Sequence, residues 1–158
     1  MTDRAVAELF APDLFSQPAP APQALPEETA AIVLRTMACH FPALKAQGPV
    51  LGLGGLGLNS TNCLVETADG ACVAKLKRDR SAAGTYRMKA RLAQFLQDAG
   101  LPVPAFSRAS DGGIIAEDEA GLWSVQRFVD APFFSGCEGE LAAAAALIGD
   151  FRQALAPL

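Results

Sequence analysis

One stretch of this 158-residue chain, residues 51–78, constrains the fold more than any other part. It reads LGLGGLGLNSTNCLVETADGACVAKLKR: a glycine-rich loop, a strand, a turn at Asp69-Gly70 and a second strand that carries Lys75. Glycines let the backbone approach a ligand closely and adopt φ values that other residues avoid. A strand lysine shares a face with the residue two positions earlier and brings a positive charge to the same ligand. The stretch therefore predicts a loop and a lysine that hold phosphate groups.

The spacing of Gly52, Gly54 and Gly57 also fits the dinucleotide fingerprint GxGxxG. In that fold the last glycine opens a helix whose N-terminus meets a pyrophosphate. Here the loop leads into residues 63–67, which have poor helix propensity and are typical of a strand. A glycine loop between two strands favours the first interpretation. An NAD-binding oxidoreductase is the weaker alternative, which a helix beginning at Gly57 would support.

Composition and charge exclude several classes of partner. Hydrophobic residues make up 51% and charged residues 19% of the chain, as in a single globular domain. The 13 basic and 17 acidic residues give a net charge of −4, and the only basic cluster is residues 75–80, so nucleic acid is not an expected partner. Asp3 and Glu8 interrupt the N-terminal segment, so we do not expect it to be a secretory signal. The longest apolar run, residues 141–148, is too short to span a bilayer. We therefore expect a cytoplasmic protein that makes no membrane contact.

The four cysteines, at positions 39, 63, 72 and 137, show no metal-ligand spacing. With Asp69 and Gly70 as the turn, Cys72 is expected opposite Thr67 and Cys63 opposite Leu76. The two strand cysteines are then not partners, and they are interpreted as buried thiols in a reducing compartment.

The rest of the pattern predicts an α+β protein. Residues 1–25, rich in alanine and proline, are predicted to form a loose tail. Helices are expected from Pro26 to near Pro42, over residues 82–99 and over residues 138–155. Further strands are expected at residues 105–108, 114–117 and 122–129. This order predicts an antiparallel sheet of five to six strands with helices on one side. The lone His40 is interpreted as a helix-end residue and not a catalyst.

This order of motifs resembles the N-terminal lobe of the aminoglycoside phosphotransferase, choline kinase and homoserine kinase-like family, which has the protein kinase-like fold. The matching segments are residues 55–62 as the phosphate loop, 70–75 as the lysine strand, 96–104 as the helix end and 126–130 as the hinge. The resemblance covers about residues 27–158. It implies a nucleotide-binding lobe over residues 26–130 and, over residues 131–158, a hinge exit and a linker helix toward a second lobe.

The resemblance implies ATP as the cofactor. Lys75 would contact the α- and β-phosphates, Val73 would cover the adenine, and the backbone of Gln126 and Phe128 would read the adenine edge. The phosphate loop would contribute Gly55, Gly57, Asn59, Ser60, Thr61 and Asn62.

Two departures from the family bear on chemistry. Lys89 stands where the family usually has the glutamate that holds the ATP lysine, and Glu66, diagonally across the hairpin from Lys75, is a possible substitute. The catalytic loop and the Mg²⁺ ligands of the family belong to a C-terminal lobe, and nothing after the hinge supplies them. No residue of this chain is therefore expected to be catalytic or to bind metal.

The resemblance implies the ATP-binding lobe of a small-molecule kinase. The departures indicate that it is inactive by itself and is a fragment, a truncated frame or one half of something larger. Its acceptor would be a hydroxyl of an aminoglycoside, an amino alcohol or a homoserine-like molecule. The alternative is a non-catalytic nucleotide-binding or regulatory module.

Overall fold

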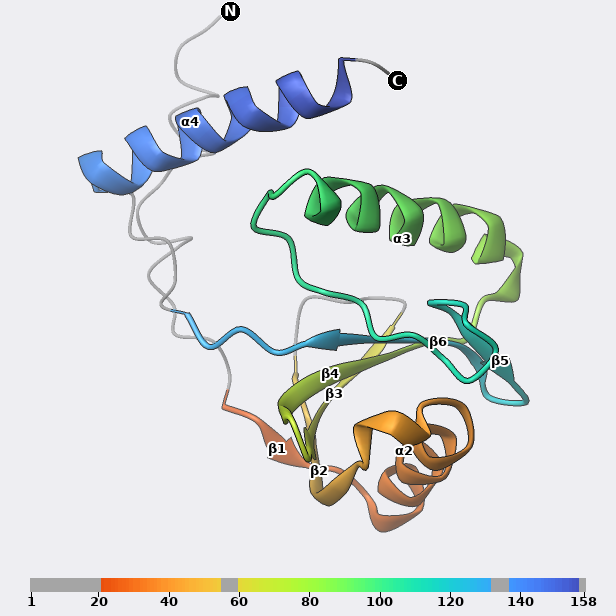
Figure 1. Ribbon diagram of the computed structural model, residues 1–158. Helices are drawn as coiled ribbons and strands as arrows, with labels where there is room; N and C mark the ends of the chain where they lie inside the picture. The colour runs from red at the N-terminus through yellow and green to blue at the C-terminus, as the bar shows by residue number, and fades with distance from the viewer. Residues whose placement is uncertain (1–20, 55–59, 132–136, 157–158) are drawn as a thin grey trace, which may run out of the picture. The chain divides into compact units, whose positions relative to one another are not determined.

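The computed structural model describes residues 21–54, 60–131 and 137–156 (Figure 1). The chain divides into two compact units. Residues 20–129 form the first, which holds the whole sheet, and the last helix, α4 (Glu138–Leu155), belongs to the second. The α4 helix has the bounds that the sequence predicts, and it continues through Gly149.

The first unit is built on a six-stranded antiparallel sheet in the order β1-β2-β3-β4-β6-β5. Its strands are β1 (Gln23–Ala24), β2 (Gln47–Gly52), β3 (Thr61–Thr67), β4 (Gly70–Lys77), β5 (Ala116–Asp118) and β6 (Gly121–Arg127). The α+β class and the antiparallel sheet confirm the prediction. Gln23 and Ala24 lie in the segment predicted as a tail, yet they pair with Gly52 and Leu51 of β2.

The helix α2 (Glu27–His40) covers one face of the sheet. It begins after Pro26 with two glutamates in its first turn, where acidic side chains favour the positive helix end. Val33, Met37 and Phe41 are each only 1% exposed. They pack against the alternate residues of β3, β4 and β6 that face this side, namely Cys63, Val65, Cys72, Ala74, Leu76, Trp123 and Val125. This is the larger core of the protein.

The helix α3 (Ala83–Asp98) packs on the opposite face, at the end formed by β5 and β6. Figure 1 shows α2 (orange) and α3 (green) on either side of the sheet, so the expectation of helices on one side is wrong. Ala90 packs with Ile115 and Leu122, and Tyr86 lies beside them. Three large apolar side chains of α3 are exposed, Met88 at 63%, Leu92 at 38% and Phe95 at 37%, whereas Leu96 is buried at 7%. Small and aromatic side chains thus make the contact with the sheet.

The β3–β4 hairpin turns one residue earlier than predicted, which shifts the pairing of the two strands by two residues. Thr67 pairs with Gly70, so the turn residues are Ala68 and Asp69. The Thr67 hydroxyl explains this choice: it donates to the Gly70 carbonyl at 2.6 Å and accepts from the Asp69 N–H at 3.3 Å. As a result Cys63 lies opposite Ala74, not Leu76, and Cys72 lies opposite Val65, not Thr67.

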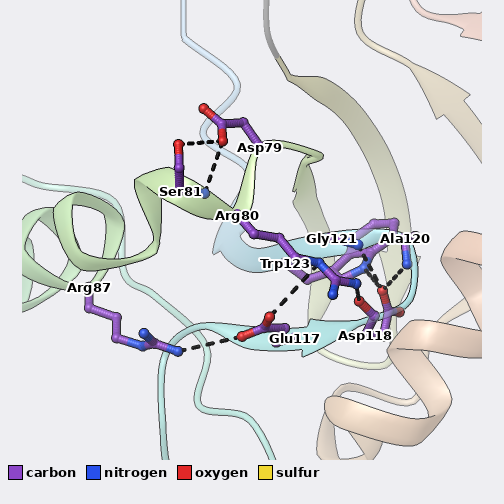
Figure 2. A network of polar contacts seen from close by, with 9 residues as sticks. All are labelled: Asp79, Arg80, Ser81, Arg87, Glu117, Asp118, Ala120, Gly121 and Trp123. Carbon is purple, nitrogen blue, oxygen red and sulfur yellow. Dashed lines mark hydrogen bonds and ion pairs between the residues drawn. The ribbon is translucent and has the colours of Figure 1, made fainter.

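Asp118 joins three parts of the fold through one carboxylate (Figure 2). It accepts from the indole N–H of Trp123 at 2.9 Å and from the Thr36 hydroxyl at 2.8 Å, 82 positions earlier in the chain. It also accepts hydrogen bonds from the backbone N–H groups of Ala120 and Gly121, which closes the β5–β6 turn.

The strand expected at residues 105–108 is reduced to a bridge between Phe106 and Gln126.

Next to this carboxylate, Glu117 forms ion pairs with two arginines (Figure 2). The N–O distances are 3.9 Å to Arg80 and 3.8 Å to Arg87 of α3. These side chains are about half exposed, so we expect each pair to add at most about 1 kcal/mol to stability. The start of α3 is therefore anchored to the β5–β6 hairpin mainly by packing.

The two strand cysteines should resist alkylation in the native protein. Burial raises the pKa of Cys63 to about 11, and burial together with the charge of Glu66 raises the pKa of Cys72 to about 11. The thiolate is the reactive form, so native labelling with iodoacetamide at pH 8 should modify the exposed Cys39 at least tenfold faster than either. Peptide mass spectrometry before and after denaturation measures this. Equal rates in the native state would contradict the burial of the hairpin.

Candidate functional site

The structure brings four of the sequence-predicted residues onto one face of the sheet, the face turned away from α2. Lys75 lies in register with Asn62 of β3 on one side and with Ser124 of β6 on the other. In the next row along this face, Val73 lies between Leu64 and Gln126. Directly opposed residues of antiparallel strands share a face and have Cβ atoms about 5 Å apart. Asn62, Val73, Lys75 and Gln126 thus form one contiguous surface across three strands.

Lys75 is the only basic residue of this surface, and it lies partly inside the protein. Its burial lowers the pKa of the ammonium group below the ordinary value of 10.5. Among the described residues Lys75 makes no ion pair and no side-chain hydrogen bond. The neighbouring Lys77 differs, because its Nζ lies 5.2 Å from the centre of the Tyr86 ring. A half-buried cation without a protein partner is well suited to bind an anionic group.

The glycine-rich loop leaves and re-enters the sheet next to this surface. The N–H of Leu53 donates to the carbonyl of Asn62 at 2.9 Å, which closes the base of the loop beside Lys75. Ser60, at the end of the loop, is half-buried. The predicted contacts of Gly55, Gly57 and Asn59 lie outside the described residues. The loop is followed by a strand from Thr61, where a dinucleotide-binding fold requires a helix, so the NAD-binding interpretation loses its structural basis.

Two other predicted residues are not brought to this surface in the expected way. Thr61 lies opposite Leu76, which belongs to the α2 side of the sheet, so its side chain is separated from Asn62 and Lys75 by the sheet itself. The N–H of Phe128 already donates to the carbonyl of Ala71 at 3.0 Å. That donor can read an adenine edge only if this bond opens.

The structure provides no carboxylate for Lys75 from either suggested position. Glu66 lies opposite Ala71, four residues along β3 from the partner of Lys75, which corresponds to about 13 Å. The expectation that it lies diagonally across from Lys75 is therefore wrong, and the cause is the two-residue change of register. Lys89 is exposed on α3, and this helix contains no glutamate.

His40 is the last residue of α2, which confirms the helix-end interpretation.

Ser124 is the site residue that sequence reasoning missed. It is only 3% exposed and lies directly beside Lys75 in the central rows of the sheet. Within β6, Ser124 alternates with the core residues Trp123 and Val125, so the sequence predicts that it lies on the opposite face of the sheet from them. Its position beside Lys75 cannot be predicted from the sequence, because the pairing of β6 with β4 depends on a connection that includes α3.

In residues 21–54, 60–131 and 137–156 no group of three or more histidine, cysteine or acidic side chains could hold a metal. These residues therefore do not fit a bound Mg²⁺ by themselves. None of the helices in the described part of the chain combines the length and the apolar character needed to cross a membrane.

No protein-family model matches the chain, and no curated protein matches it significantly.

Proposed function

We propose that this chain is the ATP-binding lobe of a small-molecule kinase and that the surface around Lys75 holds the nucleotide. The observation that carries the proposal is the row Asn62, Lys75 and Ser124, which lies at the base of the glycine-rich loop. A point charge and two polar side chains beside a loop of glycines suit the oxygen atoms of a polyphosphate. Val73 and Leu64, in the next row, give an apolar surface on which a flat base can lie.

The kinase would transfer a phosphoryl group to a hydroxyl of an aminoglycoside, an amino alcohol or a homoserine-like acceptor. ATP would supply the phosphoryl group, and the residues of this chain would bind and orient it. Lys75 would neutralise phosphate charge, and the loop would cover the phosphates. The described residues do not fit a metal site, so Mg²⁺ ligands and the acceptor-positioning carboxylate would come from a second lobe. The chain alone would bind the nucleotide without turnover, in the cytoplasm.

A specific observation favours a second function, a non-catalytic nucleotide-binding or regulatory module. Protein kinases hold the ATP lysine in place with a glutamate from a helix of the same lobe. In this chain Lys75 has no ion pair among the described residues, and Lys89 of α3 is exposed. A lysine that is not held by a carboxylate can still bind phosphate, but its position is less fixed.

Replacement of Lys75 tests both functions. We expect the purified chain to bind ATP in titration calorimetry and Lys75→Ala to weaken the binding about 10- to 100-fold, because a charged hydrogen bond to phosphate is lost. The matched control is Lys77→Ala, on the same strand and face but stacked on Tyr86, which should leave ATP affinity within about twofold. Equal losses in the two variants, or a folded chain that does not bind ATP, would contradict the proposal.

A further inference from the structure

A second candidate binding site lies on the α2 side of the sheet, the side turned away from Lys75. It is a cavity of about 260 Å³ between α2 and the ends of β3, β4 and β6. Its apolar wall includes Ile32 of α2, Leu76 and Trp123. The hydroxyl-bearing side chains of Thr29 and Thr61 also line it. A mostly apolar cavity with a few polar groups is the usual form of a small-molecule site.

The residues that line this cavity carry positive charge and no negative charge. Arg78, at the end of β4, is the only charged residue that lines it, and no carboxylate does. Within the described part of the chain Arg78 makes no ion pair and no side-chain hydrogen bond. The neighbouring cavity of about 310 Å³ is different, because Arg35 shares it with Asp118 and Glu119. Of these two cavities, the one at Arg78 combines apolar walls with a positive charge that no lining carboxylate neutralises.

Hydrogen bonds to Asp118 hold part of the cavity wall in place. The Asp118 carboxylate holds the Trp123 indole and the Ala120 backbone, and both residues line the cavity (Figure 2). The same carboxylate accepts from Thr36, which ties α2 to the β5–β6 hairpin. A site whose walls are held by hydrogen bonds loses little conformational entropy on binding.

We propose that this cavity binds a small apolar monocarboxylate, with its hydrocarbon part between Ile32, Leu76 and Trp123 and its carboxylate at Arg78. The two threonine hydroxyls can donate hydrogen bonds to the same carboxylate. A guanidinium group pairs with a carboxylate through two parallel hydrogen bonds, which distinguishes an acid from its neutral amide. The site lies across the sheet from the proposed nucleotide surface and does not depend on it.

The test is a titration of the full chain with octanoate, followed by the fluorescence of Trp123, the single tryptophan of the sequence. We expect a saturable change with a Kd below about 1 mM, and at least fivefold weaker binding of the uncharged octanamide. A linear, non-saturable change, or equal affinity for the acid and the amide, would overturn the proposal.

Two variants and a control locate the site. Arg78→Gln should weaken octanoate binding about fivefold or more and leave octanamide unchanged, whereas Arg91→Gln, an exposed arginine of α3, should change neither. Ile32→Phe fills the cavity and should abolish binding of both molecules while the circular dichroism spectrum stays native. Octanoate binding that survives Arg78→Gln at full strength, or that Arg91→Gln weakens as much, would overturn the assignment.

Discussion

Asp118→Ala should lower the free energy of unfolding by about 3–5 kcal/mol. The substitution leaves the Trp123 indole N–H and the Thr36 hydroxyl without their acceptor, although these residues are only 1% and 3% exposed. It also removes the acceptor of the Ala120 and Gly121 N–H groups in the β5–β6 turn. Urea denaturation followed by Trp123 fluorescence measures the change. The control is Glu119→Ala, an exposed neighbour, which should stay within about 0.5 kcal/mol of the wild type.

The contribution of the Asp118 carboxylate to the free energy of unfolding should depend on pH. Burial alone would raise the pKa of Asp118, but hydrogen bonds from Thr36, Trp123, Ala120 and Gly121 outweigh it, so its pKa lies below the ordinary value of 3.8. A depressed pKa means that the ionised group stabilises the folded state above the unfolded pKa and loses this effect as the pH falls through the folded pKa. The stability difference between wild type and Asp118→Ala should therefore shrink as the pH drops below 3.8. A difference that is constant between pH 7 and pH 2 would show that the ionised carboxylate is not the source.

Gly121→Ala should be comparably severe, with an expected loss of about 3–5 kcal/mol. Gly121 has a φ of +143°, a conformation that residues with a Cβ rarely adopt. An added Cβ would also collide with the backbone carbonyl oxygen of Lys77 and lie 3.1 Å from the Cα of Arg78. Because these atoms belong to the backbone of β4 and its exit, the clash cannot be relieved by a side-chain rotation. Thermal unfolding by circular dichroism should show the loss as a lower Tm.

Gly112→Ala separates the cost of a positive φ from the cost of the clash that an added Cβ makes. Gly112 also has a positive φ, +80°, but a Cβ at this position would meet no atom within 4 Å. Its substitution should cost only about 1–2 kcal/mol, the conformational part of the effect. Equal losses at positions 112 and 121 would mean that the close approach of β6 to Lys77 contributes nothing.

Local sequence signals predict the three helices of this fold well, because each helix carries its own period and end signals. Helix α2 begins after Pro26, α3 ends before Gly100, and α4 has the predicted bounds. The register of the β3–β4 hairpin was missed because one side chain, Thr67, favours it through hydrogen bonds with the Asp69 N–H and the Gly70 carbonyl. The placement of α2 and α3 on opposite faces was missed because neither helix carries a local signal for the side it covers.

The candidate site was predictable in part for the same reason. Alternation along β4 places Val73 and Lys75 on one face whatever the register. Their neighbours depend on pairing: the correct register brings Asn62 and Ser124 to Lys75 and moves Glu66 away from it. Thr61 and Asn62 lie on opposite faces because adjacent residues of a strand alternate, and Asn62 is the one that lies on the face of Lys75. The Asp118 network, which joins positions 36, 118 and 123, has no local sequence signal at all.

The strand order has a consequence for synthesis on the ribosome. β4 lies between β3 and β6, but β6 is made only after residues 78–120. Until then one edge of β4 has unpaired N–H and C=O groups beside the buried residues Cys72, Ala74 and Leu76. Such an edge can pair with another nascent chain. The arrival of Gly121–Arg127 both completes the core and removes this edge, so premature chain release within residues 78–120 should yield an aggregation-prone product.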